Sequence, residues 1–331
     1  MNMLEAAFVF FVSSWMIVSF FAPTFWAAVN VLDIYFVRGI YEDEMDGIIV
    51  SSLFQMIPWI FLPFVVTLDF SFLGEGESIF QSLHVWLAFL GGMLFSASFF
   101  FYFKALFSDS DVSLLQVLWN LAIVVVPILA FLFYGEQLLF AQYGGMGVVL
   151  FGATLLSFSS KIRRKLSSKY FWIMAGAIIL LSLSMVTEDR AYLGLSTGNS
   201  DGFWTGFLFF SLGDFFAGAL FWISSGKNIL PLVRKHYKIF ALAEGLSFVG
   251  TMASQRAISL APSVSYVATI ETFVPVFIII HCLIISIFFL YFKKDKAKVA
   301  AEMLADSLDG KWIKVAATAV MALGVYMLNS H

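Results

Sequence analysis

Long apolar stretches separated by short polar segments dominate the hydrophobic pattern of this chain. A helix needs about 20 mostly apolar residues to cross the hydrocarbon core of a bilayer, and ten stretches meet that requirement. They cover residues 8–32, 47–68, 85–107, 112–134, 141–159, 169–187, 203–224, 238–259, 263–291 and 312–329. Because backbone groups in lipid must form hydrogen bonds within their own segment, each stretch is predicted to be a helix. A transmembrane β-barrel would show short alternating segments instead of continuous runs. The pattern therefore predicts an all-α integral membrane protein with about ten transmembrane helices.

The composition supports a membrane location. Hydrophobic residues make up 61% of the chain and charged residues 12%, whereas about 25% of the residues in a soluble domain are charged. A soluble fold of this length has too much surface to hide so much apolar material, which includes 40 Phe residues. The first apolar stretch is too long for a cleavable signal peptide and is predicted to be the first span. The single cysteine, Cys282, excludes an intrachain disulfide.

Basic residues fall almost entirely on one side of the predicted membrane. The connections after the first, third, fifth, seventh and ninth predicted helices, with the adjoining helix ends, hold 17 of the 19 Lys and Arg residues. The other side has Arg190 and Arg256. Positively charged connections stay in the cytoplasm, so both termini are predicted to lie outside it. One basic segment, residues 292–311, fits either a short interfacial helix or a solvated loop.

The two halves of the chain repeat one pattern. Each has a basic residue followed by two apolar residues, then a Val-Ser pair, then a helix that contains a proline. The members are Lys104-Ala105-Leu106, Val112-Ser113 and Pro127 in the first half, and Arg256-Ala257-Ile258, Val264-Ser265 and Pro275 in the second. The halves are predicted to be residues 1–160 and 161–331. Five helices in each half force opposite orientations, which gives the inverted repeat of secondary transporters, with binding near the midplane.

Several short motifs occur in an order typical of one transporter family. They are Trp26 to Asp33 at the end of the first predicted helix; Phe103-Lys104-Ala105-Leu106, Pro127, Tyr134-Gly135-Glu136-Gln137 and Gly144-Gly145 to Leu155; and Ser265-Tyr266-Val267-Ala268 through Pro275-Val276-Phe277 in the ninth. With these motifs the whole chain resembles the drug/metabolite transporter superfamily, EamA type. The resemblance implies a ten-helix fold with a central cavity lined by most helices, and helices five and ten at the periphery. Two features depart from the family: the connection after the ninth helix is longer, and the family generally has both termini in the cytoplasm.

Polar residues form stripes along the predicted inner helices. Residues three, four or seven positions apart share one face of a helix. The stripes are Asn30 and Asp33; Ser113, Gln116 and Asn120; Ser184 and Glu188; Ser211 and Asp214; and Glu244, Ser247, Thr251 and Gln255, with Ser254 beside them. The fifth and tenth predicted helices have almost no polar residues at depth. This distribution predicts a hydrated cavity, although Ser, Thr, Asn and Gln also join helices by hydrogen bonds of about 0.6 kcal/mol each.

Buried ionisable residues are a sharper signal, because Asp or Lys at the centre of a membrane helix costs about 2.5–3.5 kcal/mol. Asp214 and Glu271 lie farthest from the predicted helix ends. Pro275 has no amide hydrogen and so frees the carbonyl of Glu271 from its helical bond. The carbonyl and carboxylate together suit a proton, a cation or an amine; the alternative is an ion pair between Glu271 and Arg256. Lys104 and Arg256 near helix ends either extend to the interface or attract anionic substrates.

Ten residues are the resulting candidates for substrate binding. The aromatic members are included because each neighbours a polar stripe. The candidates are Trp26, Asn30, Tyr102, Gln116, Trp119, Asn120, Asp214, Glu244, Gln255 and Glu271. No phosphate loop, metal-binding motif or nucleophile elbow occurs in the sequence. No catalytic residue, metal or cofactor is therefore expected.

The leading functional hypothesis is a secondary transporter that moves a small organic metabolite, such as an amino acid or an amphipathic compound, by alternating access. A lipid-carrier or lipid-linked sugar translocator of the same fold is the alternative. A membrane-embedded enzyme or a channel is less favoured, since the charged groups are dispersed and no filter-like sequence occurs. The expected partners are the small-molecule substrate, membrane lipid and a coupling proton or cation, without nucleic acid. The protein is expected in the cell (inner) membrane as a monomer or homodimer.

Overall fold

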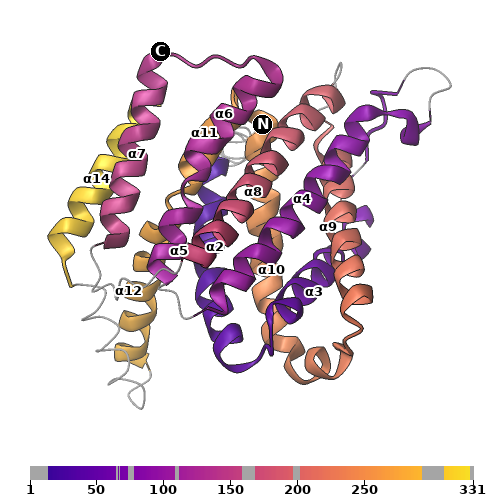
Figure 1. Ribbon diagram of the computed structural model, residues 1–331, viewed down its shortest axis with the longest axis horizontal. Helices are drawn as coiled ribbons and strands as arrows, with labels where there is room; N and C mark the ends of the chain where they lie inside the picture. Colours follow the sequence, from indigo (N-terminus) through magenta and orange to yellow (C-terminus); the bar gives the residue numbers. More distant parts are fainter. Residues whose placement is uncertain are drawn as a thin grey trace, which may run out of the picture.

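Helices make up nearly all of the described structure, and the described residues contain no strand. The computed structural model describes residues 14–64, 66, 68–73, 78–108, 112–158, 168–196, 202–292 and 309–328. The helices are α2 (Trp15–Gly39), α3 (Glu44–Gln55), α4 (Leu83–Leu106), α5 (Val112–Trp119), α6 (Ala122–Tyr134), α7 (Phe140–Phe158), α8 (Ser168–Leu195), α9 (Phe203–Ser225), α10 (Leu230–Leu260), α11 (Val264–Glu271), α12 (Val274–Phe292) and α14 (Lys311–Leu328), with short 3₁₀ helices η1 (Pro58–Ile60), η2 (Leu62–Phe64) and η3 (Ile79–Gln81). They form one bundle (Figure 1).

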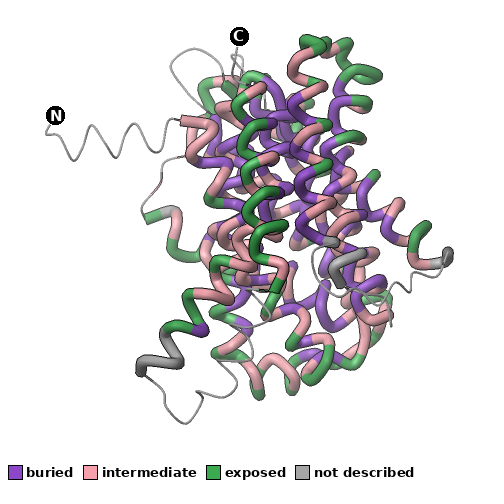
Figure 2. The backbone as a smooth tube through the Cα atoms, turned by 90° about the vertical axis from the view of Figure 1, so that its left-hand side faces the viewer, coloured by how far each residue is buried: buried purple, intermediate pink, exposed green. Residues whose placement is uncertain are grey.

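Eight helical segments of the described chain are long and apolar enough to cross a membrane. They are α2, α4, the α5–α6 segment from Leu115, α7, α8, α9, the α11–α12 segment and α14. Many large apolar side chains point outward from the bundle, among them Phe140, Ile223 and Tyr326, which are 93%, 78% and 70% exposed. Exposed positions follow the outer faces of the helices, and buried positions lie inside (Figure 2). Such an apolar exterior suits lipid, and the fold is that of a helical, multi-pass membrane protein.

Two predicted spans differ from simple membrane helices. The stretch 47–68 is not continuous, because α3 ends at Gln55 and η1 and η2 follow. Pro58 and the next proline remove amide hydrogens from this segment, so an α-helix cannot continue through it. The stretch 238–259 lies within α10, which has 31 residues. Its first turns carry Arg234, Lys235 and Lys238, and α10 is not among the eight apolar segments.

Two helices are interrupted at matching positions. The predicted fourth helix is divided into α5 and α6 by a turn at Asn120 and Leu121, and the predicted ninth into α11 and α12 by a turn at Thr272 and Phe273. The start of α11 follows the start of α5 by 152 positions, and the start of α12 follows the start of α6 by the same 152. The two interruptions are therefore equally spaced from the helix starts before them. Helices from early and late in the chain also pack together, α4 against α8 and α2 against α10.

Helices α7 and α14 lie side by side at one edge of the bundle (Figure 1). Glycines bring their backbones together. A Cβ atom on Gly145 would lie 2.8 Å from the carbonyl oxygen of Gly324, and a Cβ on Gly324 would lie 2.6 Å from the carbonyl oxygen of Gly145. Small residues at membrane helix contacts permit this close approach. The glycines of α7 thus serve helix packing.

We expect Gly145→Ala to destabilise the folded protein by about 1–2 kcal/mol, because the added methyl group would press on a backbone carbonyl that cannot move aside. Gly147→Ala is the matched control on the same helix, since a Cβ there meets no atom within 4 Å. Thermal unfolding of both purified variants in detergent measures the difference. Equal unfolding midpoints would contradict the backbone contact.

Candidate functional site

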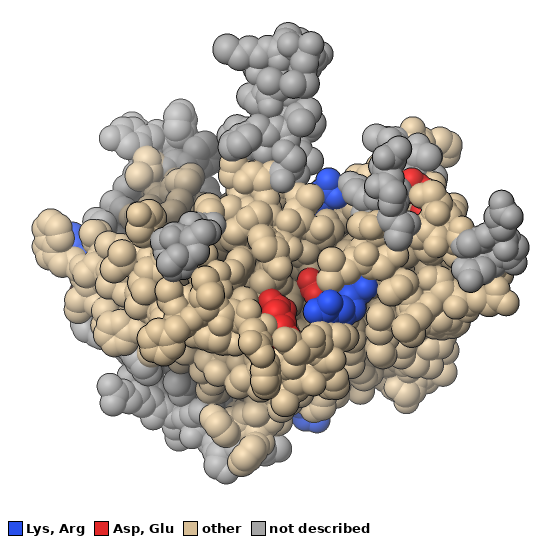
Figure 3. Space-filling model, turned by 90° about the horizontal axis from the view of Figure 1, so that it is seen from above, with Lys and Arg blue, Asp and Glu red and all other residues tan. Residues whose placement is uncertain are grey.

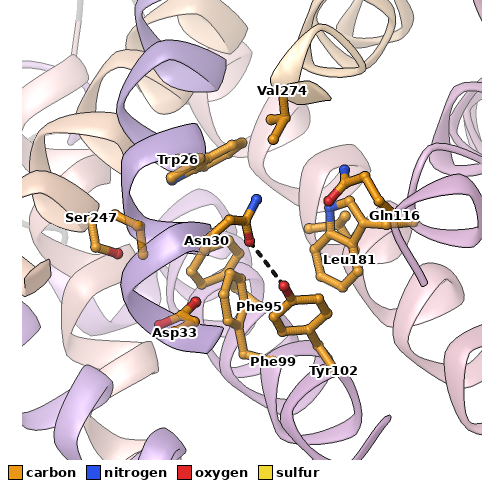
Figure 4. A pocket seen from close by; sticks show the side chains of 12 residues that line it. Trp26, Asn30, Asp33, Phe95, Phe99, Tyr102, Gln116, Leu181, Ser247 and Val274 are labelled. Carbon is orange, nitrogen blue, oxygen red and sulfur yellow. Dashed lines mark hydrogen bonds between the residues drawn. The ribbon is translucent and has the colours of Figure 1, made fainter. Parts of the chain in front are cut away.

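A small cavity of about 40 Å³ lies between six helices of the bundle. Its walls come from α2 (Trp26, Val29, Asn30, Asp33), α4 (Phe95, Phe99, Tyr102), α5 (Gln116, Trp119), α8 (Leu181), α10 (Ser247) and α12 (Val274). In Figure 4, Trp26 and Val274 lie on one side, Phe99 and Tyr102 on the other, and Gln116 faces Asn30 across the space. The first three of these helices precede residue 160 and the other three follow it, so both halves of the chain contribute.

Aromatic rings dominate the cavity wall. The rings of Tyr102 and Trp119 have centroids 5.0 Å apart, and the ring of Phe99 lies 5.7 Å from that of Trp119. The Tyr102 hydroxyl donates a hydrogen bond of 2.9 Å to Asn30 Oδ1 (Figure 4). Face and edge contacts between such rings stabilise their arrangement beyond simple burial. The wall is therefore a preformed aromatic surface with a few polar atoms.

Asp33 is the one charged residue in the cavity wall. It is buried, with 5% of its surface exposed, and among the described residues no hydrogen bond or ion pair holds its carboxylate. Asp33 lies one helical turn after Asn30 and two turns after Trp26, which places the three on one face of α2. A buried carboxylate without a partner is unfavourable in a membrane protein unless a ligand, a proton or water satisfies it.

Trp26 is held in place by the neighbouring helix. A Cβ on Gly250 of α10 would lie 2.8 Å from Cδ1 of the indole, so the glycine makes room for the ring. The indole Nε1 is buried and has no hydrogen-bond partner among the described residues. Pro23, inside α2, lies three residues earlier and leaves the carbonyl of Ser19 without its usual amide donor. The indole nitrogen is thus a free donor in the wall of the cavity.

The structure brings together five of the ten candidate residues, and the other five lie outside the cavity wall. Trp26, Asn30, Tyr102, Gln116 and Trp119 form part of the wall. Asn120 is buried behind it and accepts a hydrogen bond of 3.3 Å from Gln116 Nε2. The remaining four, Asp214, Glu244, Gln255 and Glu271, make polar contacts outside the wall, and the Glu244 carboxylate lies near enough to Asp33 for their charges to interact.

Asp214 and Glu244 lie in polar contacts between helices. Asp214 Oδ1 accepts a hydrogen bond of 2.9 Å from Ser52 Oγ, which is 3.0 Å from Ser96 Oγ. These contacts join α9 to α3 and α4. Glu244 on α10 accepts a hydrogen bond from Ser51 of α3. Both carboxylates therefore link helices from different halves of the chain.

Gln255 and Glu271 lie in another cluster, with Glu188. Gln255 Nε2 donates to Glu188 Oε2, and the Tyr192 hydroxyl donates to Gln255 Oε1 over 2.8 Å. Glu271 Oε1 accepts a hydrogen bond of 2.6 Å from Ser254 Oγ. The alternative of an ion pair between Glu271 and Arg256 is wrong, because the carboxylate bonds to Ser254 and the arginine guanidinium lies 5.0 Å above the Phe203 ring.

The described basic residues lie mainly at the end of the bundle where α2, α4 and α9 end. At this end Lys227, just after α9, forms two ion pairs, with Asp43 Oδ2 at 2.7 Å and with Asp46 Oδ1 at 2.9 Å. The opposite end carries Arg190 and Arg256. Figure 3 views that end and shows a small cluster of acidic and basic side chains beside a central hollow, with a few others scattered toward the edges of a mostly uncharged face. The basic segments 161–165 and 293–298 lie outside the described residues.

Several residues of the cavity wall were not among the sequence candidates. Asp33 belonged to a polar stripe, and its spacing from Asn30 and Trp26 was the signal that linked it to them. Phe95 and Phe99 gave no signal, because 40 Phe residues cannot be told apart by type. Within the described part of the chain, no group of three or more His, Cys, Asp or Glu residues is arranged to hold a metal ion.

Comparison with known proteins defines the fold only. No protein-family model matches the sequence, and no curated protein sequence matches it. Twenty-eight chains of solved structures match the fold. One of them, a crystal structure described only as that of a protein, superposes with a TM-score of 0.61 over 96% of this chain and 99% of its own, at 16% sequence identity. At this low sequence identity, the likeness concerns the arrangement of the helices alone.

Proposed function

We propose that the protein is a secondary transporter of the drug/metabolite type and that its substrate is a small amphipathic organic cation. The single observation that carries this proposal is the cavity, which combines an aromatic wall with one unpartnered carboxylate, Asp33. Aromatic faces attract organic ammonium groups, most strongly when the groups are removed from water. A carboxylate in the same wall supplies the opposite charge that such a group needs inside a membrane.

The substrate is expected to lie between Asp33 and the aromatic rings. The ammonium group contacts the carboxylate and the faces of Tyr102 and Trp119, and its apolar part lies against Phe95 and Phe99. Ligand pockets of about 300–1,000 Å³ hold small molecules. The cavity of about 40 Å³ is smaller than that, so its walls must move apart to admit the substrate. A lipid-linked sugar, the alternative substrate, would need a larger space that opens sideways to lipid.

Alternating access requires two units that move against each other around the site. Two observations support two inverted five-helix halves, and with them ten spans. The two helix interruptions lie 152 positions apart, and helices of the first half pack against helices of the second, α4 with α8 and α2 with α10. The cavity has walls from both halves. Rocking of one half against the other would expose the same wall to each side of the membrane in turn.

A thermal-shift screen of the purified protein against small amines and their neutral analogues tests the proposed substrate class. A ligand that binds the folded state alone raises the unfolding temperature. We expect cationic amphiphiles to raise it and uncharged analogues of equal size to have little effect. Stabilisation by neutral or anionic compounds with none by cations would exclude this substrate class and favour the lipid-linked alternative or another metabolite.

The orientation in the membrane follows from the charge distribution. Because the ten predicted spans put 17 of the 19 basic residues on the side opposite the termini, we expect both termini outside the cytoplasm. Reporter fusions at residue 331 and near residue 163 measure this directly. A reporter active in the cytoplasm at residue 331 would show the reverse orientation, which is the one usual for the family that the sequence resembles.

A further inference from the structure

The second half of the chain places a different chemistry at the position that corresponds to the cavity wall. Tyr102 and Trp119 contact each other in the wall. The residues 152 positions later are Ser254 and Glu271, and the two helix interruptions are separated by the same 152 positions. Ser254 and Glu271 also contact each other, through a hydrogen bond of 2.6 Å. Where one half has a phenol beside an indole, the other has a hydroxyl beside a carboxylate.

A second carboxylate completes this acidic position. Glu188 of α8 is 1% exposed, and its two oxygens accept hydrogen bonds from Ser184 Oγ and Gln255 Nε2. Gln255 and Ser254 are neighbours on α10, and each bonds to one of the two carboxylates. Glu188 and Glu271 therefore meet at one turn of α10, close enough for the charge of one to oppose the charge of the other.

Neither carboxylate has a cation to neutralise it among the ion pairs of the described residues. Other titratable and charged groups on and around α8 have contacts of their own, including Asp189, which pairs with Arg190 at 3.6 Å. Tyr192 donates to Gln255, Arg256 lies over Phe203, Tyr134 of α6 lies under Arg190, His84 of α4 lies against Gly194, and Asp214 of α9 bonds to Ser52. Ionisation of both carboxyl groups in one buried site is energetically unfavourable, because their charges repel. A state with one proton between the two carboxyl groups relieves this repulsion.

We propose that Glu188 and Glu271 together hold one exchangeable proton, and that this acidic pair is the coupling site of the transporter, separate from the substrate cavity. The coupling role rests on the proposed function, but the proton site does not. A proton suits the geometry better than a metal ion. Gln255 Nε2 and Ser254 Oγ donate hydrogen bonds to the carboxylates, whereas a hard cation would require several free oxygen ligands.

The chain offers a direct connection from the acidic pair to the cavity. Glu271 is the last residue of α11, and the turn at Thr272 and Phe273 follows it. Pro275 cannot donate to the carbonyl of Glu271, so this turn lacks one helical bond. Val274, three residues after Glu271, lies in the cavity wall. Loading or releasing the proton at Glu271 thus acts on a short, weakly bonded segment that borders the substrate.

Infrared difference spectra of the full-length protein in nanodiscs, recorded between acidic and alkaline pH without substrate, test the proton site. We expect a carboxylic acid carbonyl band that appears at acidic pH and disappears in both Glu188→Gln and Glu271→Gln. The matched control, Asp214→Asn, should retain the band. Loss of the band in the control, or its persistence in both Gln variants, would overturn the proposal. Ser254→Ala should shift the band and serves as the test if Glu188→Gln does not fold.

Two further experiments test whether the bound ion is a proton or a metal cation and whether the site couples transport. Addition of sodium at constant pH should leave the spectrum unchanged; a sodium-dependent change of the band would overturn the proton in favour of a metal cation. In proteoliposomes, Glu271→Gln should keep substrate exchange between equal pools and lose accumulation driven by a pH gradient. Unchanged accumulation by this variant would overturn the coupling role. Because the spectra need no substrate, failure of the proposed function would leave the spectral result intact.

Discussion

Asp33→Asn should weaken the binding of a quaternary ammonium ligand about 10- to 100-fold. The substitution keeps the size of the side chain but removes the one charge in the cavity wall. A hydrogen bond or close contact to a charged group contributes about 1.5–3 kcal/mol, and every 1.4 kcal/mol changes affinity about tenfold. Titration of the purified protein with the ligand measures the change.

A neutral ligand of the same shape provides the internal control for this variant. Its affinity should differ little between the wild-type protein and Asp33→Asn, because the carboxylate makes no ion pair with it. Asp214→Asn is the matched control substitution, since Asp214 bonds to Ser52 outside the cavity wall. Equal weakening of both ligands by Asp33→Asn would show that the residue acts through the fold instead of through charge.

Lys227→Met should destabilise the protein by about 2–3 kcal/mol. The ammonium group holds Asp43 and Asp46, and Asp46 is buried. Removing one partner leaves the carboxylates without a cation, which costs about 3–5 kcal/mol for a fully buried pair; Lys227 is a quarter exposed, so the effect is smaller. Thermal or denaturant unfolding in detergent measures it.

The double variant Lys227→Met with Asp46→Asn should recover part of this loss, because the buried charge is then removed together with its partner. Burial alone would lower the pKa of Lys227, but the hydrogen bonds and charges of Asp43 and Asp46 raise it. The lysine therefore stays charged at neutral pH, and its stabilising effect is lost only as the pH rises through that raised value. No recovery in the double variant would contradict the ion pair.

The sequence predicted the class of the fold and the positions of most helices because these depend on the length of apolar runs. It also indicated a lost helical bond at Glu271, since Pro275 has no amide hydrogen, but it predicted one continuous helix over 263–291 and not the interruption. The matching interruption at Asn120 and Leu121 has no such marker. Pro127 frees the carbonyl of Ile123, which lies beyond the turn, so tertiary packing determines where this helix breaks.

Side-chain partners were predictable only where helical spacing limits them. The stripe that contains Gln116 and Asn120 gave a contact within one helix, and the structure shows their hydrogen bond. The partnership of Glu188 with Gln255 joins α8 to α10, and no spacing within either helix reveals which helices face each other. For the same reason the spacing could not reveal that, of Gln116, Asn120, Glu244 and Gln255, which were expected to face one cavity, only Gln116 lies in its wall.

Solute counterflow in proteoliposomes tests the central claim most directly, because it detects transport without any assumption about energy coupling. Vesicles that contain the purified protein are loaded with an unlabelled cationic amphiphile identified by thermal shift and diluted into a trace of the labelled compound. We predict a transient accumulation of label that protein-free vesicles lack and that Asp33→Asn reduces about 10-fold or more, in line with the lost charge contact. Entry of label at the same rate with and without the protein, for a ligand that binds it tightly, would contradict the account and identify a binding protein that does not transport.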